Sequence, residues 1–180
     1  LNIKDLHILK TFKKYTKAEK RIYFNDKTSK NKNINPGIQA TLSFRSEKMK
    51  KNLIALGIIP RKSLKIKFPN NKQLPKKYMK DFVRGYFDGD GSISKSMRVD
   101  FTSGSKIFLL SLKKILEKYL NVSNLKVENR TNKTNFSSSN RAKRLYIQKK
   151  EYIKKLFLFM YKNSQPELRL KRKYLAFKNV

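Results

Sequence analysis

Three glycines and two aspartates lie within one short stretch of the chain, FVRGYFDGDGSI at residues 82–93. The pattern predicts a helix over about 76–89, and Gly85 and Gly89 are four positions apart, so they share one face of that helix. A glycine inside a helix costs about 1 kcal/mol relative to alanine. Two on one face indicate a packing requirement, because a second helix can then approach backbone to backbone.

The end of this helix carries the acidic side chains. We expect Gly91 to end it in the left-handed conformation, which glycine adopts readily. Asp90 then lies at the helix terminus, beyond the packed seam, while Asp88 faces the structure or a partner helix. Two symmetric copies of the helix would bring two such carboxylates together, and magnesium requires oxygen ligands of this type.

The net charge makes these carboxylates unusual. Among 180 residues there are 45 Lys and Arg but only 12 Asp and Glu, a formal net charge of +33. This excess predicts a polyanionic partner, and nucleic acid is the commonest one inside a cell. The 38% of apolar residues supply a core, which argues against a disordered polycation. With no Cys and one His, disulfides, thiolate chemistry and Cys- or His-rich metal sites are excluded.

Membrane insertion and secretion are not expected. No stretch approaches the roughly 18 apolar residues that a spanning helix needs. The first residues, LNIKDLHILK, carry charges inside an apolar pattern, unlike a signal peptide. We therefore expect no membrane partner and a location in an intracellular compartment that contains DNA (cytoplasm or nucleoid, or an organelle matrix), without secretion.

Apolar periodicity predicts an α+β chain in which helices and strands alternate. The expected helices cover 4–16, 46–56, 76–89, 106–120, 150–162 and 167–177. The expected strands cover 21–25, 39–45, 92–95, 97–103, 124–129 and 143–148. In the first strand, Ile22 and Phe24 are expected to face the core.

The two halves of the chain resemble each other. The strand-to-helix stretch 40–56 aligns with 144–159, and 1–15 aligns with 99–119 once a short gap is allowed. The alternative is a chance similarity between two basic stretches of strand and helix. A repeat predicts pseudo-twofold symmetry between two half-domains.

We place the first half-domain at 1–75 and the second at 76–180. The second opens with the glycine-rich helix at 82–91. The counterpart of that helix in the first half-domain would lie upstream of Leu1.

Val83 to Gly91 resemble the nine positions of the LAGLIDADG motif of homing endonucleases. The three glycines and both aspartates match, and Arg84 departs from the small residue at the second position. The segment ALGIIPRKSLKIKFP before it is similar to the stretch before the second motif of two-motif members. The resemblance implies the LAGLIDADG homing-endonuclease fold, in which two pseudo-symmetric αββαββ-like half-domains with antiparallel sheets form a DNA-binding saddle.

The resemblance also implies the site residues. Asp90, with the Gly89 carbonyl, would bind Mg²⁺ or another divalent cation, and Asp90 would be catalytic. Gly85, Gly89 and Asp88 would form the packing surface of the motif helix. Lys149, at the junction of the last strand and its helix, matches the region where the family places a basic residue near the scissile phosphate. A solvated helix start is the alternative for Lys149.

The segment DGDGSI also resembles part of an EF-hand calcium loop. If Asp90 were the fifth loop position, Tyr86 would be the first and Met97 the twelfth. Neither side chain can supply the essential carboxylate. An EF-hand is therefore rejected.

The strands alternate between apolar and polar residues, so one face is polar. Arginine pairs with guanine, and glutamine or asparagine with adenine, in the major groove. The expected DNA-contacting residues are Arg21, Tyr23, Asn25, Gln39, Thr41, Ser43, Arg45, Arg98, Asp100, Thr102, Lys126, Arg144, Tyr146 and Gln148. The alternative is an ordinary solvent-facing sheet surface.

The resemblance implies site-specific, magnesium-dependent cleavage of double-stranded DNA by a hydrolase that copies its reading frame, often within an intron or intein, into an empty allele. The alternative is a catalytically inactive LAGLIDADG-fold protein, either an RNA maturase that binds a group I intron or a DNA-binding regulator. A structural RNA-binding protein is a third hypothesis, which leaves the acidic motif unexplained.

Cutting both strands takes two motif aspartates, and this chain has one. Either the first motif helix precedes Leu1, or two chains associate through the exposed motif helix at 82–91. The repeat spacing favours the first explanation, in which the fragment could itself be inactive.

Overall fold

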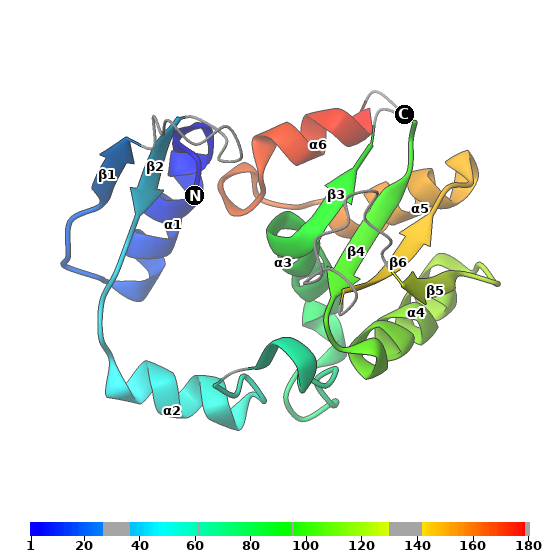
Figure 1. Cartoon of the computed structure of the whole chain (residues 1–180), viewed down its shortest axis with the longest axis horizontal. Helices are drawn as coiled ribbons and strands as arrows, with labels where there is room; N and C mark the ends of the chain where they lie inside the picture. Colours follow the sequence, from blue (N-terminus) through cyan, green and yellow to red (C-terminus); the bar gives the residue numbers. More distant parts are fainter. Residues whose placement is uncertain (27–36, 61, 95, 130–141, 179–180) are drawn as a thin grey trace. The chain divides into compact units, whose positions relative to one another are not determined.

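The computed structural model describes residues 1–26, 37–60, 62–94, 96–129 and 142–178 (Figure 1). Contacts divide the chain into two compact units. The first comprises Leu1–Glu47 with Gln165–Lys171, and the second Lys48–Ser164 with Arg172–Val180. The half-domain boundary expected after residue 75 is based on the sequence repeat and not on contacts, so it stays a prediction.

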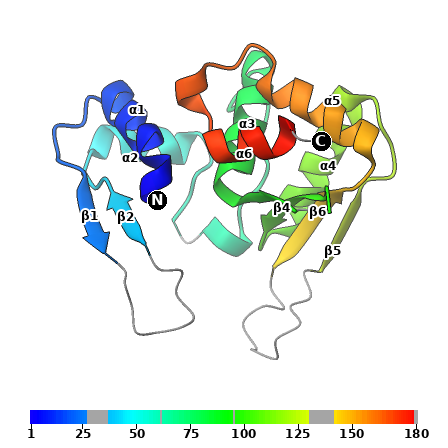
Figure 2. The same ribbon diagram turned by 90° about the horizontal axis from the view of Figure 1, so that it is seen from above.

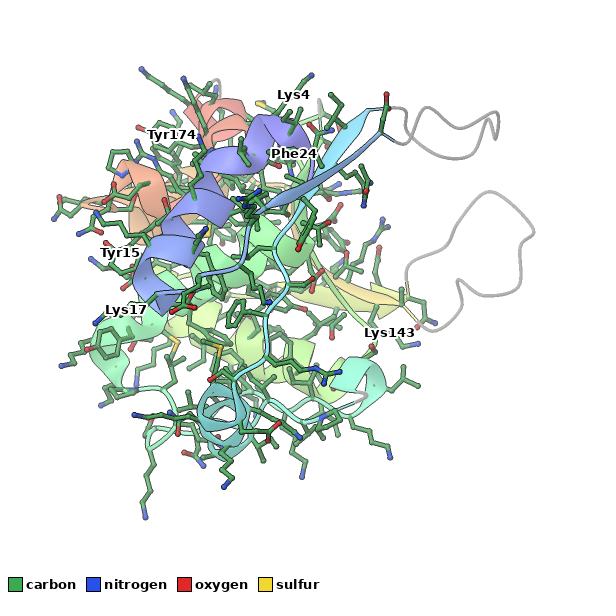
Figure 3. All side chains as sticks on the ribbon, turned by 90° about the vertical axis from the view of Figure 1, so that its left-hand side faces the viewer. Lys4, Tyr15, Lys17, Phe24, Lys143 and Tyr174 are labelled. Atoms are coloured by element: carbon green, nitrogen blue, oxygen red, sulfur yellow. The ribbon has the colours of Figure 1, made fainter. Side chains whose placement is uncertain are left out.

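The first unit is a small α+β body. Its elements are η1 (Ile3–Asp5), α1 (Leu6–Thr16), β1 (Tyr23–Asp26), β2 (Ile38–Thr41) and η5 (Pro166–Leu168). β1 and β2 pair antiparallel, with Phe24 opposite Ala40. Ala40 is fully buried, but Phe24, labelled in Figure 3, is 54% exposed. Phe24 therefore lies on the same face as buried Ala40, as the alternation predicts, but its side chain stays exposed because a two-stranded sheet has too little apolar surface to cover the ring.

The second unit contains the larger core. Its elements are η2 (Lys62–Leu64), η3 (Lys76–Tyr78), α3 (Met79–Asp90), β3 (Gly91–Ile93), β4 (Val99–Ser103), α4 (Lys106–Leu120), β5 (Lys126–Asn129), β6 (Lys143–Ile147) and α5 (Lys150–Tyr161), and most of α2 (Glu47–Ala55) and of α6 (Lys171–Lys178). The four strands form an antiparallel sheet in the order β3-β4-β6-β5. Helices α3, α4, α5 and α6 cover one face of it (Figure 2). The core between helices and sheet includes Phe87, Phe101, Leu112, Leu145, Ile153 and Leu156.

Two stretches of the chain share an order of elements. α1–β1–β2–α2 in the first part of the chain corresponds to α4–β5–β6–α5 in the second, and both strand pairs are antiparallel. Just before α1, Asn2 bridges Gln39 of β2, as Thr102 before α4 pairs with Arg144 of β6. This is the correspondence that the proposed repeat requires.

Local sequence explains most element boundaries. α4 begins where Ser105 accepts a hydrogen bond from the Phe108 amide at 3.3 Å, a typical N-cap. The last helix begins at Lys171 rather than at 167, because Arg169 is extended. Among the described residues, no helix combines the length and the apolar character needed to cross a membrane.

Candidate functional site

The motif helix α3 has one buried and one open face. Val83 and Phe87 are fully buried against the core of the second unit. Gly85 and Gly89 are exposed, and a Cβ built at either would meet no atom within 4 Å in the described part of the chain. Neither glycine is required by the packing of the described residues, so the open face is available to a second helix, as the sequence predicts.

The buried face explains the unusual Arg84 in the motif. Its guanidinium is 4% exposed, donates to the Met160 carbonyl at 3.1 Å and forms an ion pair with Asp81 at 2.8 Å. Arg84 thus links α3 to the last turn of α5. A buried charge with a carboxylate and a carbonyl as partners avoids the cost of an unpaired charge.

The two motif aspartates have different surroundings. The Tyr161 hydroxyl donates to Asp88 Oδ1 at 3.2 Å, so Asp88 is held towards α5. Asp90, the last residue of α3, is exposed. This agrees with the expectation that Asp88 faces the structure, and it leaves the Asp90 carboxylate accessible at the helix end.

A buried lysine contacts the C-terminal end of α3. Lys173 of α6 is 6% exposed, and its ammonium donates to the carbonyls of Phe87 at 2.6 Å, Asp88 at 2.7 Å and Gly91 at 2.6 Å. The C-terminal carbonyls of a helix carry partial negative charge, which a cation stabilises. Lys173 therefore fixes the junction from which Asp90 projects.

Lys173 was not among the residues expected from the sequence, although the pattern around it indicates that it is buried. Leu170, Tyr174 and Phe177 recur at helical spacing, and Lys173 falls within that apolar stripe. A lysine at such a position is almost never buried without partners. Its three carbonyl partners lie more than 80 residues earlier in the chain, so periodicity alone cannot identify them.

Gly91 has a different role from the predicted one. Its φ of −86° and ψ of 164° are extended, so the left-handed C-cap expected there is wrong. A Cβ at Gly91 would lie 2.6 Å from the Phe87 carbonyl oxygen and would overlap the Phe87 ring. Glycine is needed because the chain passes directly from α3 into β3 across that ring.

The strand register separates Lys149 from Asp90. Gly91 pairs with Phe101, and Phe101 pairs with Leu145. Asp90 precedes this row, while Lys149 lies four residues beyond it in the opposite direction along the strands. Asp90 and Lys149 therefore lie beyond opposite ends of the paired strands.

Lys149 is instead the exposed N-cap residue of α5, with its ammonium 5.1 Å from the Tyr152 ring centroid. The catalytic role that the resemblance implies for Lys149 stays a prediction. Its place after a strand was visible in the sequence, but the direction of that strand relative to β3 was not. Lys173 is a basic residue at the end of α3 that carries Asp90.

The oxygen donors at this end of α3 could supply part of a metal site. In the described ranges, no cluster of three or more acidic or histidine side chains could hold a metal ion. One motif helix supplies the Asp90 carboxylate and the backbone carbonyls of the last turn, including that of Gly89. Magnesium takes oxygen ligands and keeps several waters, so two such ends facing each other would fit it.

The sheet of the second unit brings together the expected DNA-contacting residues of that half. Val99, Phe101, Leu145 and Ile147 are buried on the core face, so the alternating residues lie on the other face. Asp100 pairs with Tyr146, which pairs with Lys126, and Thr102 pairs with Arg144. Arg98 precedes β4, and Gln148 follows β6 and is exposed.

The remaining expected contacts belong to the first unit. Tyr23 pairs with Thr41, and Asn25 with Gln39, so each pair lies on one face of its sheet. Arg21, Ser43 and Arg45 lie outside the strands and are exposed. Contact of these residues with DNA stays a prediction.

Tyr86 links α3 to the sheet beside Asp90. Its hydroxyl donates to the Thr102 carbonyl at 2.6 Å. Burial raises the pKa of Tyr86 to about 12, the negative charge of Asp90 adds to this, and a hydrogen bond with Ser103 opposes it. The phenol therefore stays neutral over the physiological range.

The raised pKa predicts a loss of stability in alkali. In the unfolded chain Tyr86 ionises near pH 10, but in the folded chain near 12, so its contribution is complete below pH 10 and is lost as the pH rises to 12. The unfolding free energy, measured by urea titration without metal, should therefore fall less between pH 10 and pH 12 in Tyr86→Phe than in the wild type. Tyr78→Phe, at a ring 50% exposed, is the matched control. Equal slopes for all three proteins would contradict the assignment.

Comparison with known proteins identifies one domain in the chain. Residues 77–158 match the family described as LAGLIDADG-like domain, and the match lies within the second unit. This stretch is therefore a LAGLIDADG-like domain, which confirms the resemblance over these residues and the α+β fold.

Over 46 residues, the chain is 46% identical to a probable translation initiation factor IF-2 of Thermococcus kodakarensis. That match takes in 25% of this chain but only 4% of the archaeal protein. No solved structure matches the chain.

Proposed function

We propose that the protein is a LAGLIDADG homing endonuclease, a divalent-metal-dependent hydrolase that cuts double-stranded DNA at a specific site. One observation carries the proposal: Asp90 is exposed at the end of α3, directly beyond the open face of Gly85 and Gly89. A helix packed on that face places its own terminal carboxylate next to Asp90. The two together offer the oxygen ligands that a shared Mg²⁺ needs.

The residues of this chain have separate tasks in that site. Asp90 and the Gly89 carbonyl hold the cation, and Asp88 holds α3 against Tyr161 of α5. Lys173 keeps the helix end in place and neutralises its carbonyls. When bound, Mg²⁺ activates water and neutralises charge on the leaving oxygen of the phosphodiester. The +33 charge attracts the phosphate backbone and makes binding depend steeply on salt.

The biological role that we propose is homing, which the resemblance to this family implies. A homing endonuclease copies its own reading frame, within an intron or intein, into an allele that lacks it. The short match inside a much longer translation initiation factor is what a segment carried within a host reading frame would leave. Such a protein acts in an intracellular compartment that contains DNA.

A cleavage and binding experiment tests the proposal. The full-length protein is incubated with a plasmid library of randomised sites in Mg²⁺, and cut ends are sequenced; binding to duplex DNA and to group I intron RNA is measured in parallel. We expect magnesium-dependent ends at one sequence. Duplex binding without cleavage supports a DNA-binding regulator, and tight intron binding without cleavage supports a maturase; either result overturns the nuclease.

The open glycine face predicts association between motif helices. In sedimentation equilibrium, Gly85→Leu with Gly89→Leu should weaken self-association of the chain by roughly 100-fold or more, because two side chains inserted into a backbone-to-backbone seam each cost 1–3 kcal/mol. Ala176→Leu, an exposed position on α6, is the control. A double variant that associates like the wild type would show that the glycine face is not the seam.

A further inference from the structure

Two arginines on the polar face of the four-stranded sheet are each held by a carboxylate. Arg98 Nε donates to Asp100 Oδ2 at 3.2 Å. Arg144 Nε donates to Glu128 Oε1 at 2.7 Å, and its terminal nitrogen also contacts that oxygen. The Arg144 guanidinium lies 5.7 Å from the Tyr146 ring centroid.

These carboxylates are unexpected where they lie. The chain has only 12 acidic residues, and a carboxylate on a surface that meets DNA opposes the attraction of the phosphates. Partly exposed ion pairs also contribute little to stability. Neither charge balance nor folding therefore accounts for an acid beside each arginine, and a role in recognition does.

The geometry suits the recognition of guanine. Each carboxylate engages the Nε side of its arginine, so the plane of the guanidinium is fixed. The terminal N–H groups that remain can donate together to O6 and N7 of guanine in a major groove. The Arg98 side chain is 31% exposed and the Arg144 side chain is 19% exposed, so a base can reach the terminal nitrogens of both arginines.

The other carboxylate oxygen of Asp100 has a different environment. Its Oδ1 is buried and has no hydrogen-bond partner among the described residues, and the residue is 8% exposed. A buried acceptor without a donor is unfavourable unless a donor arrives. A DNA base cannot reach this buried oxygen, so Asp100 acts through Oδ2, which orients Arg98.

We propose that Arg98–Asp100 and Arg144–Glu128 are two guanine-reading units, in which Asp100 and Glu128 are the positioning residues that determine specificity. The inference rests on the proposed binding of duplex DNA. Glu128 was not among the residues expected from the sequence, because its pairing partner lies across the β5–β6 register.

Selection from randomised duplexes tests the proposal on the full chain without need of cleavage. Wild type, Asp100→Asn and Glu128→Gln are selected in parallel at constant salt, and folding is checked by circular dichroism. In each variant, the preference for guanine at one position of the site should fall at least about tenfold. The affected position should differ between the two variants. Each should also bind random duplex more tightly, because a negative charge is removed and an arginine is released to the phosphates.

Glu151→Gln is the matched control, since this exposed acid lies on α5, away from the sheet. It should bind random duplex slightly more tightly and keep every base preference. Unchanged preferences in Asp100→Asn and Glu128→Gln, with binding intact, would overturn the guanine-reading units. Failure of the wild type to bind any duplex would instead overturn the proposed function.

Discussion

Asp90→Asn should abolish magnesium-dependent cleavage, with a loss of at least about 1000-fold in rate, because it removes a metal ligand from a site that acts as a unit. Binding of duplex DNA should stay equal or rise slightly, since one negative charge is lost. Cleavage and binding are measured on the same purified protein, by plasmid linearisation and by a filter assay in EDTA.

Asp88→Asn is the matched control for that experiment. It changes a carboxylate two residues away that accepts a hydrogen bond from the Tyr161 hydroxyl. We expect a modest loss of stability and far less loss of cleavage than in Asp90→Asn. Equal losses in the two variants would contradict the division of tasks between the aspartates.

Replacing Lys173 should have the second large effect. Three backbone carbonyls would lose their buried donor, so Lys173→Met should lower the unfolding free energy by about 3 kcal/mol. Because the chain has no cysteine, Lys173→Cys introduces a single thiol. Alkylation of that thiol in the unfolded state with bromoethylamine recreates a lysine-like ammonium. After refolding, the aminoethylated protein should recover stability and cleavage, and the S-methylated protein should not.

Lys178→Cys, an exposed position on the same helix, is the control for this chemistry. It should retain stability and cleavage before and after alkylation. If the unmodified Lys173→Cys protein were as stable and as active as the wild type, the ammonium would not hold the end of α3.

Much of this arrangement follows from local sequence. The helix expected at 106–120 is α4 to the residue, because its apolar stripe and Ser105 cap agree. The glycine spacing of the motif predicted the open face of α3. The scarcity of acidic residues in the chain indicated that Asp88 and Asp90 belong to a functional site. These are features that depend on neighbours along the chain.

The errors concern contacts between distant segments. Lys149 and Lys173 are both basic residues near the start of a helix, and only the pairing of β6 with β4 shows which end of the sheet each occupies. Gly91 follows the pattern of a helix cap, but the Phe87 ring decides its conformation. Phe24 lies opposite buried Ala40, as its alternation predicts, but a sheet of only two strands leaves its side chain exposed.

We infer that the end of α3 at Asp90 holds the divalent cation of a nuclease. Electron paramagnetic resonance of Mn²⁺, titrated into the full-length protein bound to duplex DNA, measures this directly. We predict bound Mn²⁺ in the wild type and its loss in Asp90→Asn at the same DNA occupancy. Equal Mn²⁺ binding by the two proteins would contradict the claim.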